Sequence, residues 1–197
     1  MVNAPAAPAV DRRYWTVPIG RAVLALIPAA VITFNADHSP EFGLVVFGAF
    51  ALLSGLFLAV LSWRTLGDPR ARTLFLVQGL VGVVLGGLAL VLHTGGLGFF
   101  LYVVSVWAAV TGFLELYSGT RARGKSASAR DWMSMGALTA VLALVFLILP
   151  PHAVVSVGLL GAYFVIVGVY LFIGGFSLKW ATTPAAATSS AKDSDIS

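Results

Sequence analysis

Two polar side chains in the apolar part of the chain are candidates for chemistry. Glu115 is the only carboxylate within an apolar segment, and ionisable residues inside a membrane are functional candidates by default. It lies six residues, about 9 Å along a helix, before Arg121, which predicts a position near an interface. Two interpretations stay open: a structural carboxylate paired with Arg121, Arg123 or another interfacial cation, or a proton or ion site. For Gln78 the sequence favours an interhelical hydrogen bond over a substrate contact.

The three histidines form the second candidate group. His38, His93 and His152 lie in or beside short connections that contain no Lys or Arg, one in each third of the chain. They have three interpretations: solvated loop residues, a pH-responsive cluster, or a three-histidine metal site. No two of them have the i, i+4 spacing of a preformed helical metal site, so a site would need three connections to converge, and we predict none.

The sequence contains no recognisable catalytic or cofactor motif. Residues 95–98 (GGLG) lack the lysine and spacing of a phosphate-binding loop. Asp37 and Glu41 share one short exposed segment, and no Ser, His and Asp set is expected at one depth. The absence of cysteine excludes disulfides and thiolate chemistry. We therefore predict no catalytic residue, no cofactor and no metal.

The elements that position these residues are apolar helices. Of the 197 residues 59% are hydrophobic and 10% charged, whereas soluble domains carry about 25% charged residues. A bilayer core needs about 20 mainly apolar helical residues per span. The pattern predicts an all-α membrane protein, covered by lipid, with six transmembrane helices at about 17–35, 42–63, 73–93, 98–117, 132–149 and 153–176.

The cations indicate how the spans are oriented. All twelve Lys and Arg lie before or early in the first span, in the connections after the second and fourth, or after the sixth. By the positive-inside rule, both termini are predicted to be cytoplasmic, in a bacterial plasma membrane. This topology explains the net charge of +4, and no nucleic-acid partner is expected. Residues 1–16 and 181–197, rich in Ala, Pro, Ser and Thr, are predicted to be disordered tails.

Small residues recur with a period of about 57. In the second, fourth and sixth spans a small residue is followed two positions later by an aromatic and seven positions later by a glycine. Residues four or seven apart share a helix face, so these positions predict close helix packing. Three tandem two-helix hairpin repeats follow, at about 17–73, 74–130 and 131–180, related by a pseudo-threefold axis. The packing residues are Gly48, Gly55, Gly82, Gly86, Ser105, Gly112, Gly161 and Gly168.

The motif Gly-Ala-aromatic-x4-Gly at residues 48–55 and 161–168 resembles the HdeD-like membrane proteins, which are built from short two-helix repeats and typified by a bacterial acid-resistance protein. The resemblance covers about residues 17–180, and the second copy departs from the motif at residues 105–107 (SVW). It implies an inner-membrane protein with a role in acid stress and no established biochemical activity.

The leading interpretation is a non-enzymatic integral membrane protein associated with acid or envelope stress. A transporter or channel for a small solute is the second, and it requires a polar path through the bundle. The third is an assembly partner of another membrane protein or of a second copy. It requires small-residue faces that are not paired within the chain.

Overall fold

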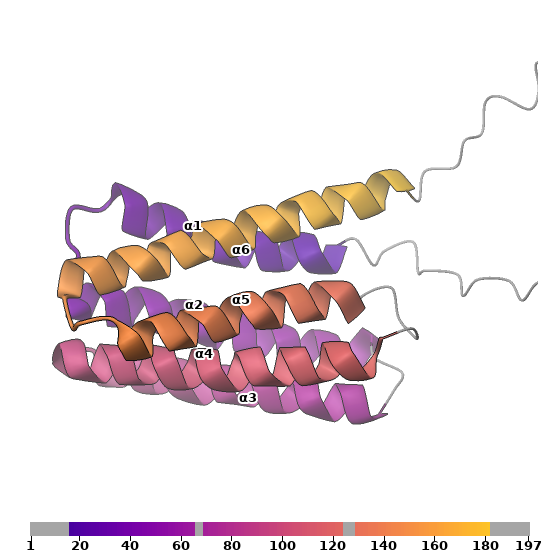
Figure 1. The fold of residues 1–197 in the computed structure, drawn as a ribbon, viewed down its shortest axis with the longest axis horizontal. Helices are drawn as coiled ribbons and strands as arrows, with labels where there is room; N and C mark the ends of the chain where they lie inside the picture. Colours follow the sequence, from indigo (N-terminus) through magenta and orange to yellow (C-terminus); the bar gives the residue numbers. More distant parts are fainter. Residues whose placement is uncertain (1–15, 66–68, 124–128, 182–197) are drawn as a thin grey trace, which may run out of the picture.

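The computed structural model describes residues 16–65, 69–123 and 129–181, and they form six helices (Figure 1). No strand occurs in these ranges, so the predicted all-α fold is confirmed. The predicted tails, except for Thr16 and Ala181, lie outside the described residues. The helices are α1 (Thr16–Phe34), α2 (Pro40–Thr65), α3 (Pro69–Val91), α4 (Gly96–Arg121), α5 (Ala129–Ile148) and α6 (Ala153–Ala181).

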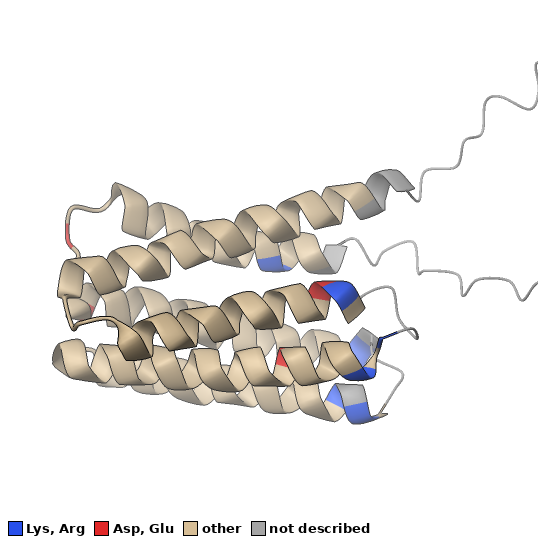
Figure 2. Ribbon diagram, in the orientation of Figure 1, with Lys and Arg blue, Asp and Glu red and all other residues tan. Residues whose placement is uncertain are grey.

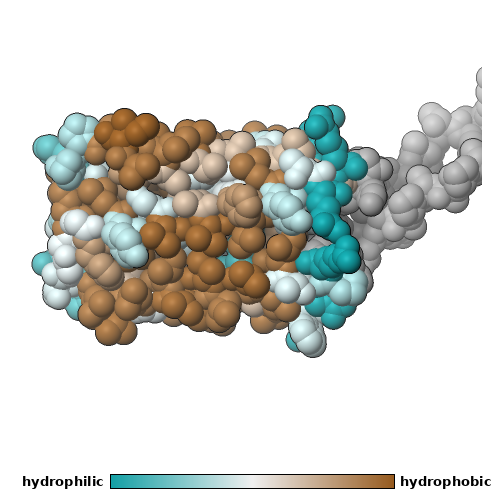
Figure 3. Space-filling model, turned by 60° about the horizontal axis from the view of Figure 1, so that its bottom comes forward, coloured by the Kyte–Doolittle hydropathy of each residue, from teal (hydrophilic) through white to brown (hydrophobic). Residues whose placement is uncertain are grey.

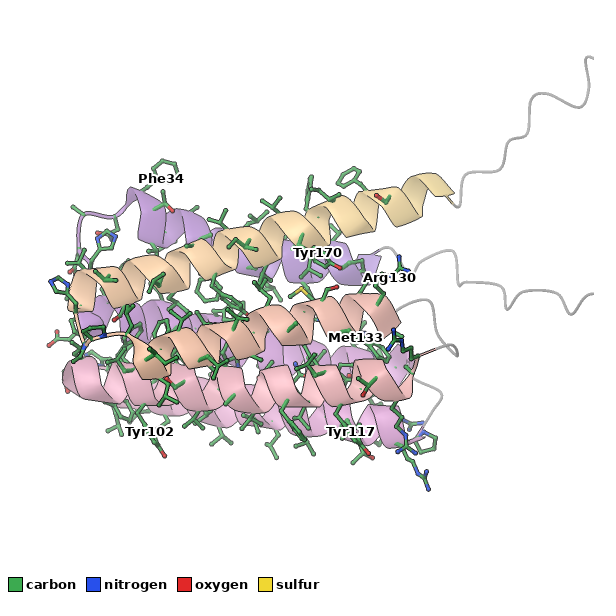
Figure 4. All side chains as sticks on the ribbon, viewed as in Figure 1. Phe34, Tyr102, Tyr117, Arg130, Met133 and Tyr170 are labelled. Atoms are coloured by element: carbon green, nitrogen blue, oxygen red, sulfur yellow. The ribbon has the colours of Figure 1, made fainter. Side chains whose placement is uncertain are left out.

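The exposed surface is that of a helical membrane protein. Helices α2 to α6 are each long and apolar enough to cross a bilayer, while the apolar part of α1, Pro18–Phe34, is shorter. Apolar side chains cover most of the middle of the face shown in Figure 3, and hydrophilic ones lie at its two ends, most densely at one of them. Tyr102 and Tyr117 point outward from α4 at two levels (Figure 4), as expected for aromatic residues near membrane interfaces.

Local sequence explains where the helices begin. Ser39 is the N-cap of α2, because its hydroxyl accepts a hydrogen bond from the backbone nitrogen of Phe42 at 3.2 Å. Pro40 then occupies the first helical position, where a missing N–H costs nothing, and Pro69 has the same place in α3. Gly96 begins α4 with a φ of +74°, a conformation that favours glycine.

Successive helices are antiparallel, so the connections between α1 and α2, α3 and α4, and α5 and α6 lie at one end (Figure 1). The most extensive contacts are between α2 and α3, α4 and α5, and α6 and α1. These pairs straddle the predicted repeat boundaries. Because α1 packs against α6, the six helices form a closed ring. In this ring α1 occupies the position that the first helix of a fourth repeat would have.

The glycines of two of these pairs lie in equivalent registers. A Cβ added to Gly55 on α2 would lie 2.5 Å from the carbonyl oxygen of Gly79 on α3. A Cβ on Gly112 would lie 3.0 Å from the carbonyl oxygen of Gly136 on α5. Gly112 and Gly136 thus lie 57 residues after Gly55 and Gly79, respectively. These backbones approach so closely that only glycine fits without displacement of a helix.

The other predicted packing residues show different degrees of crowding. Gly48, Gly82 and Gly86 face backbone atoms across the α2–α3 contact. In the α6–α1 pair, Gly161 faces the side chain of Ile32, and Gly168 faces that of Leu26. Ser105 is half-buried.

The contact between α5 and α6 is looser than the two equivalent contacts in the ring. Contacts between α5 and α6 are few, compared with those between α1 and α2 or between α3 and α4. Tyr170 of α6 lies between α5 and α6 (Figure 4), and its hydroxyl is 3.4 Å from Asp131 Oδ1 on α5. The pseudo-threefold arrangement is therefore approximate.

Candidate functional site

Three helices bring charged and polar side chains together inside the bundle. Glu115 of α4 is 1% exposed, and its Oε1 accepts hydrogen bonds from Arg21 Nη2 of α1 at 2.7 Å and from Gln78 Nε2 of α3 at 3.0 Å. The Arg21 side chain is 24% exposed. A buried carboxylate requires such partners, since transfer of an unpaired charge out of water is very costly.

The sequence left three partners open for Glu115, namely Arg121, Arg123 or another interfacial cation, and the structure shows another cation, Arg21. Arg121 instead donates to the Tyr117 hydroxyl at 3.3 Å. Six residues correspond to about 600° of helical rotation, so Arg121 and Glu115 lie on different faces of α4. The expected interhelical hydrogen bond of Gln78 is present.

Beside this cluster lies a cavity of about 50 Å³. Three buried polar atoms of residues that line it have no hydrogen-bond partner: Glu115 Oε2, Gln78 Oε1 and Thr111 Oγ1. Buried polar atoms in native proteins are normally satisfied by protein or by ordered water. The cavity therefore has a lining that can bind a hydrogen-bond donor.

The cavity lies on the pseudo-threefold axis, because equivalent positions of the repeat line it together. Five sets of three lining residues are each spaced by 57 or 56 residues. These are Arg21, Gln78 and Met135; Ala25, Gly82 and Thr139; Phe50, Trp107 and Tyr163; Ser54, Thr111 and Val167; and Leu58, Glu115 and Leu171.

Aromatic rings separate the polar cluster from the cation-free end. Phe50, Trp107 and Tyr163 line the cavity, and the Trp107 ring is 5.7 Å from that of Phe50 and 6.3 Å from that of Tyr163. Thr139 donates its hydroxyl proton to the Met135 carbonyl at 2.9 Å, so in the 2.9 Å contact between the two hydroxyls Tyr163 is the donor. Trp107 and Tyr163 are buried, and Phe50 is half-buried.

The histidines lie away from this cavity. His93 and His152 are exposed and His38 is half-buried, and all three lie in or beside the three connections at the cation-free end. His38 Nδ1 is 3.4 Å from the Ala36 carbonyl oxygen and His93 Nδ1 is 3.1 Å from that of Leu90, so these contacts are local. No group of three His, Asp or Glu suited to a metal occurs within residues 16–65, 69–123 and 129–181.

Sequence reasoning missed several residues of the cavity. Arg21 was counted only among the cations before or early in the first span, and Thr111, Thr139, Trp107 and Tyr163 were not singled out as polar or aromatic lining. The 57-residue period was the available signal, because it makes Arg21 equivalent to Gln78.

Comparison with known families supports the period independently. A family described as "Short repeat of unknown function (DUF308)" matches residues 20–91 and again residues 77–148, two copies whose first residues are 57 apart. No curated protein and no solved structure matches the chain. The two copies together extend over more than half of the sequence, and the chain therefore belongs to the DUF308 short-repeat family.

Proposed function

We propose that this protein is a non-enzymatic component of a bacterial plasma membrane that contributes to tolerance of acid or envelope stress. The observation that carries the proposal is the position of His38, His93 and His152 in or beside the three connections at one end of the bundle. The resemblance to HdeD-like proteins supports the same role.

The distribution of charge supports a cytoplasmic location of both termini. Lys and Arg gather at the end where α1 begins and α6 ends, as Figure 2 shows. The positive-inside rule places this end in the cytoplasm. The opposite end, with the three histidines, then faces the medium whose acidity changes.

Acidification makes a surface that carries histidines more positive. Asp37, Glu41 and the three histidines lie at this outer end. Added positive charge there would repel incoming cations, and mutual repulsion between the connections would alter their packing.

The packing of the bundle argues against the two rival functions. Within the described residues, Phe47, Phe100 and Phe164 are buried in the core together with aliphatic side chains, and such an apolar core does not favour a polar channel. The predicted packing glycines contact neighbouring helices of the same chain. They therefore do not provide the free small-residue face that an assembly partner would use.

Survival of a deletion strain across external pH tests the proposal. We expect lower survival in acid, restored by the parent chain and restored less by a variant that combines His38→Gln, His93→Gln and His152→Gln. Thr94→Ser, a conservative change in the same exposed region, is the matched control. Full protection by the triple variant at an equal membrane level would contradict a role for the histidines.

A further inference from the structure

We infer that the cavity on the pseudo-threefold axis binds a small hydrogen-bond donor of the size of ammonium or water, held by Glu115, Gln78 and Thr111. This inference is independent of the proposed stress role. It rests on three unpartnered polar atoms, each on a residue at least nine-tenths buried, that belong to the lining of one cavity.

The unpartnered atoms define the chemistry of the guest. Glu115 Oε2 and Gln78 Oε1 can only accept hydrogen bonds when the carboxylate is ionised, and the Thr111 hydroxyl can also accept one. A guest with several N–H or O–H donors satisfies them together. An anion or a pure acceptor would leave two of the three without a partner.

Charge and size narrow the choice further. Arg21 contacts only one oxygen of Glu115, so the second oxygen can accept a hydrogen bond from a bound molecule. Phe50, Trp107 and Tyr163 also line the cavity, and aromatic rings favour cations. A water molecule needs at least about 10–15 Å³ of such space, so 50 Å³ admits a few small molecules and no large solute.

The pseudo-threefold axis explains why one polar site arises here. At the position of Glu115 the other two repeats carry Leu58 and Leu171, and at that of Thr111 they carry Ser54 and Val167. The repeats thus differ in polarity where they meet. The result is an asymmetric site, with acceptors from α3 and α4.

The test is a thermal unfolding series on the purified full chain in detergent. Ammonium chloride is compared with potassium chloride at equal ionic strength, because K⁺ has a similar size and no hydrogen-bond donor. We expect ammonium to raise the Tm by about 2–4 °C, the shift that roughly 1 kcal/mol produces in a chain of this length. Glu115→Gln and Thr111→Val should each abolish this rise. Ser118→Ala should keep it, because Ser118 is also buried with an unpartnered hydroxyl but does not line the cavity.

An experimental density map shows whether the cavity is occupied, and the comparison of Tm values distinguishes ammonium from water. Equal Tm values in both salts, with an ordered molecule within hydrogen-bond distance of Glu115 Oε2, would identify water. Equal Tm values with an empty cavity would overturn the inference. A rise that persists in both Glu115→Gln and Thr111→Val would also overturn it, since ammonium would then act elsewhere.

Discussion

Replacement of Gly112 by alanine tests whether backbone contact between α4 and α5 holds the bundle together. The new Cβ would lie 2.7 Å from the backbone nitrogen of Ala140 and 3.0 Å from the Gly136 carbonyl oxygen. Carbon contacts are normally about 3.5–4.0 Å, so α5 would have to move by about 1 Å. Neither contact atom belongs to a flexible side chain. We expect a loss of about 1–3 kcal/mol in the free energy of unfolding, the range for overpacked cores.

Gly87 on α3 provides the matched control, because a Cβ there meets nothing within 4 Å. Gly87→Ala should leave stability unchanged or raise it by up to about 1 kcal/mol, since alanine favours the helix over glycine. Gly168→Ala should lie between the two, because its nearest neighbour is the side chain of Leu26, which can rotate. Denaturant unfolding in detergent micelles measures all three. Equal stability of the Gly112 and Gly87 variants would refute the argument from backbone contact.

Three further predictions follow from the same contacts. Arg21→Met should lower the free energy of unfolding by about 1–3 kcal/mol, which is less than the loss of a partner costs in a fully buried ion pair, because Arg21 is partly exposed. The same change should cost clearly less in a Glu115→Gln background. A double-mutant cycle without coupling would contradict this. Tyr163→Phe should cost about 0.5–1.5 kcal/mol in denaturant unfolding, since Thr139 keeps its bond to the Met135 carbonyl; an unchanged midpoint would show that the hydroxyl contact contributes nothing. A reporter active only outside the cytoplasm, fused after residue 180, should stay inactive, and activity would reverse the proposed topology.

The helices could be predicted from the sequence because apolar length is a local property. The expected segments coincide with α1 to α6 to within a few residues at most ends. The 57-residue period was visible as well, since small residues recur at fixed helical spacing. The sequence did not indicate which helices pair most closely. Consecutive helices in each predicted hairpin share a connection, yet the main contacts involve the next helix along or, for α6, the first helix.

The site was harder to predict because its atoms come from distant parts of the chain. Glu115 and Gln78 were identified as polar residues in apolar segments, a signal contained in one helix. Arg21 lies 94 residues from Glu115, and its contact depends on closure of the ring by α1. The proximity of Arg121 in the sequence was misleading because side-chain direction on a helix changes by about 100° per residue.

The closure of the ring by α1 has a consequence for synthesis of the protein in the cell. Arg21 leaves the ribosome 94 residues before Glu115, an interval of about 5–20 s at ordinary elongation rates. The short first helix is therefore synthesised before Glu115, the partner of its arginine. It is also synthesised before α6, which is the last helix in the chain. During this interval α1 lacks the neighbours that it has in the folded bundle.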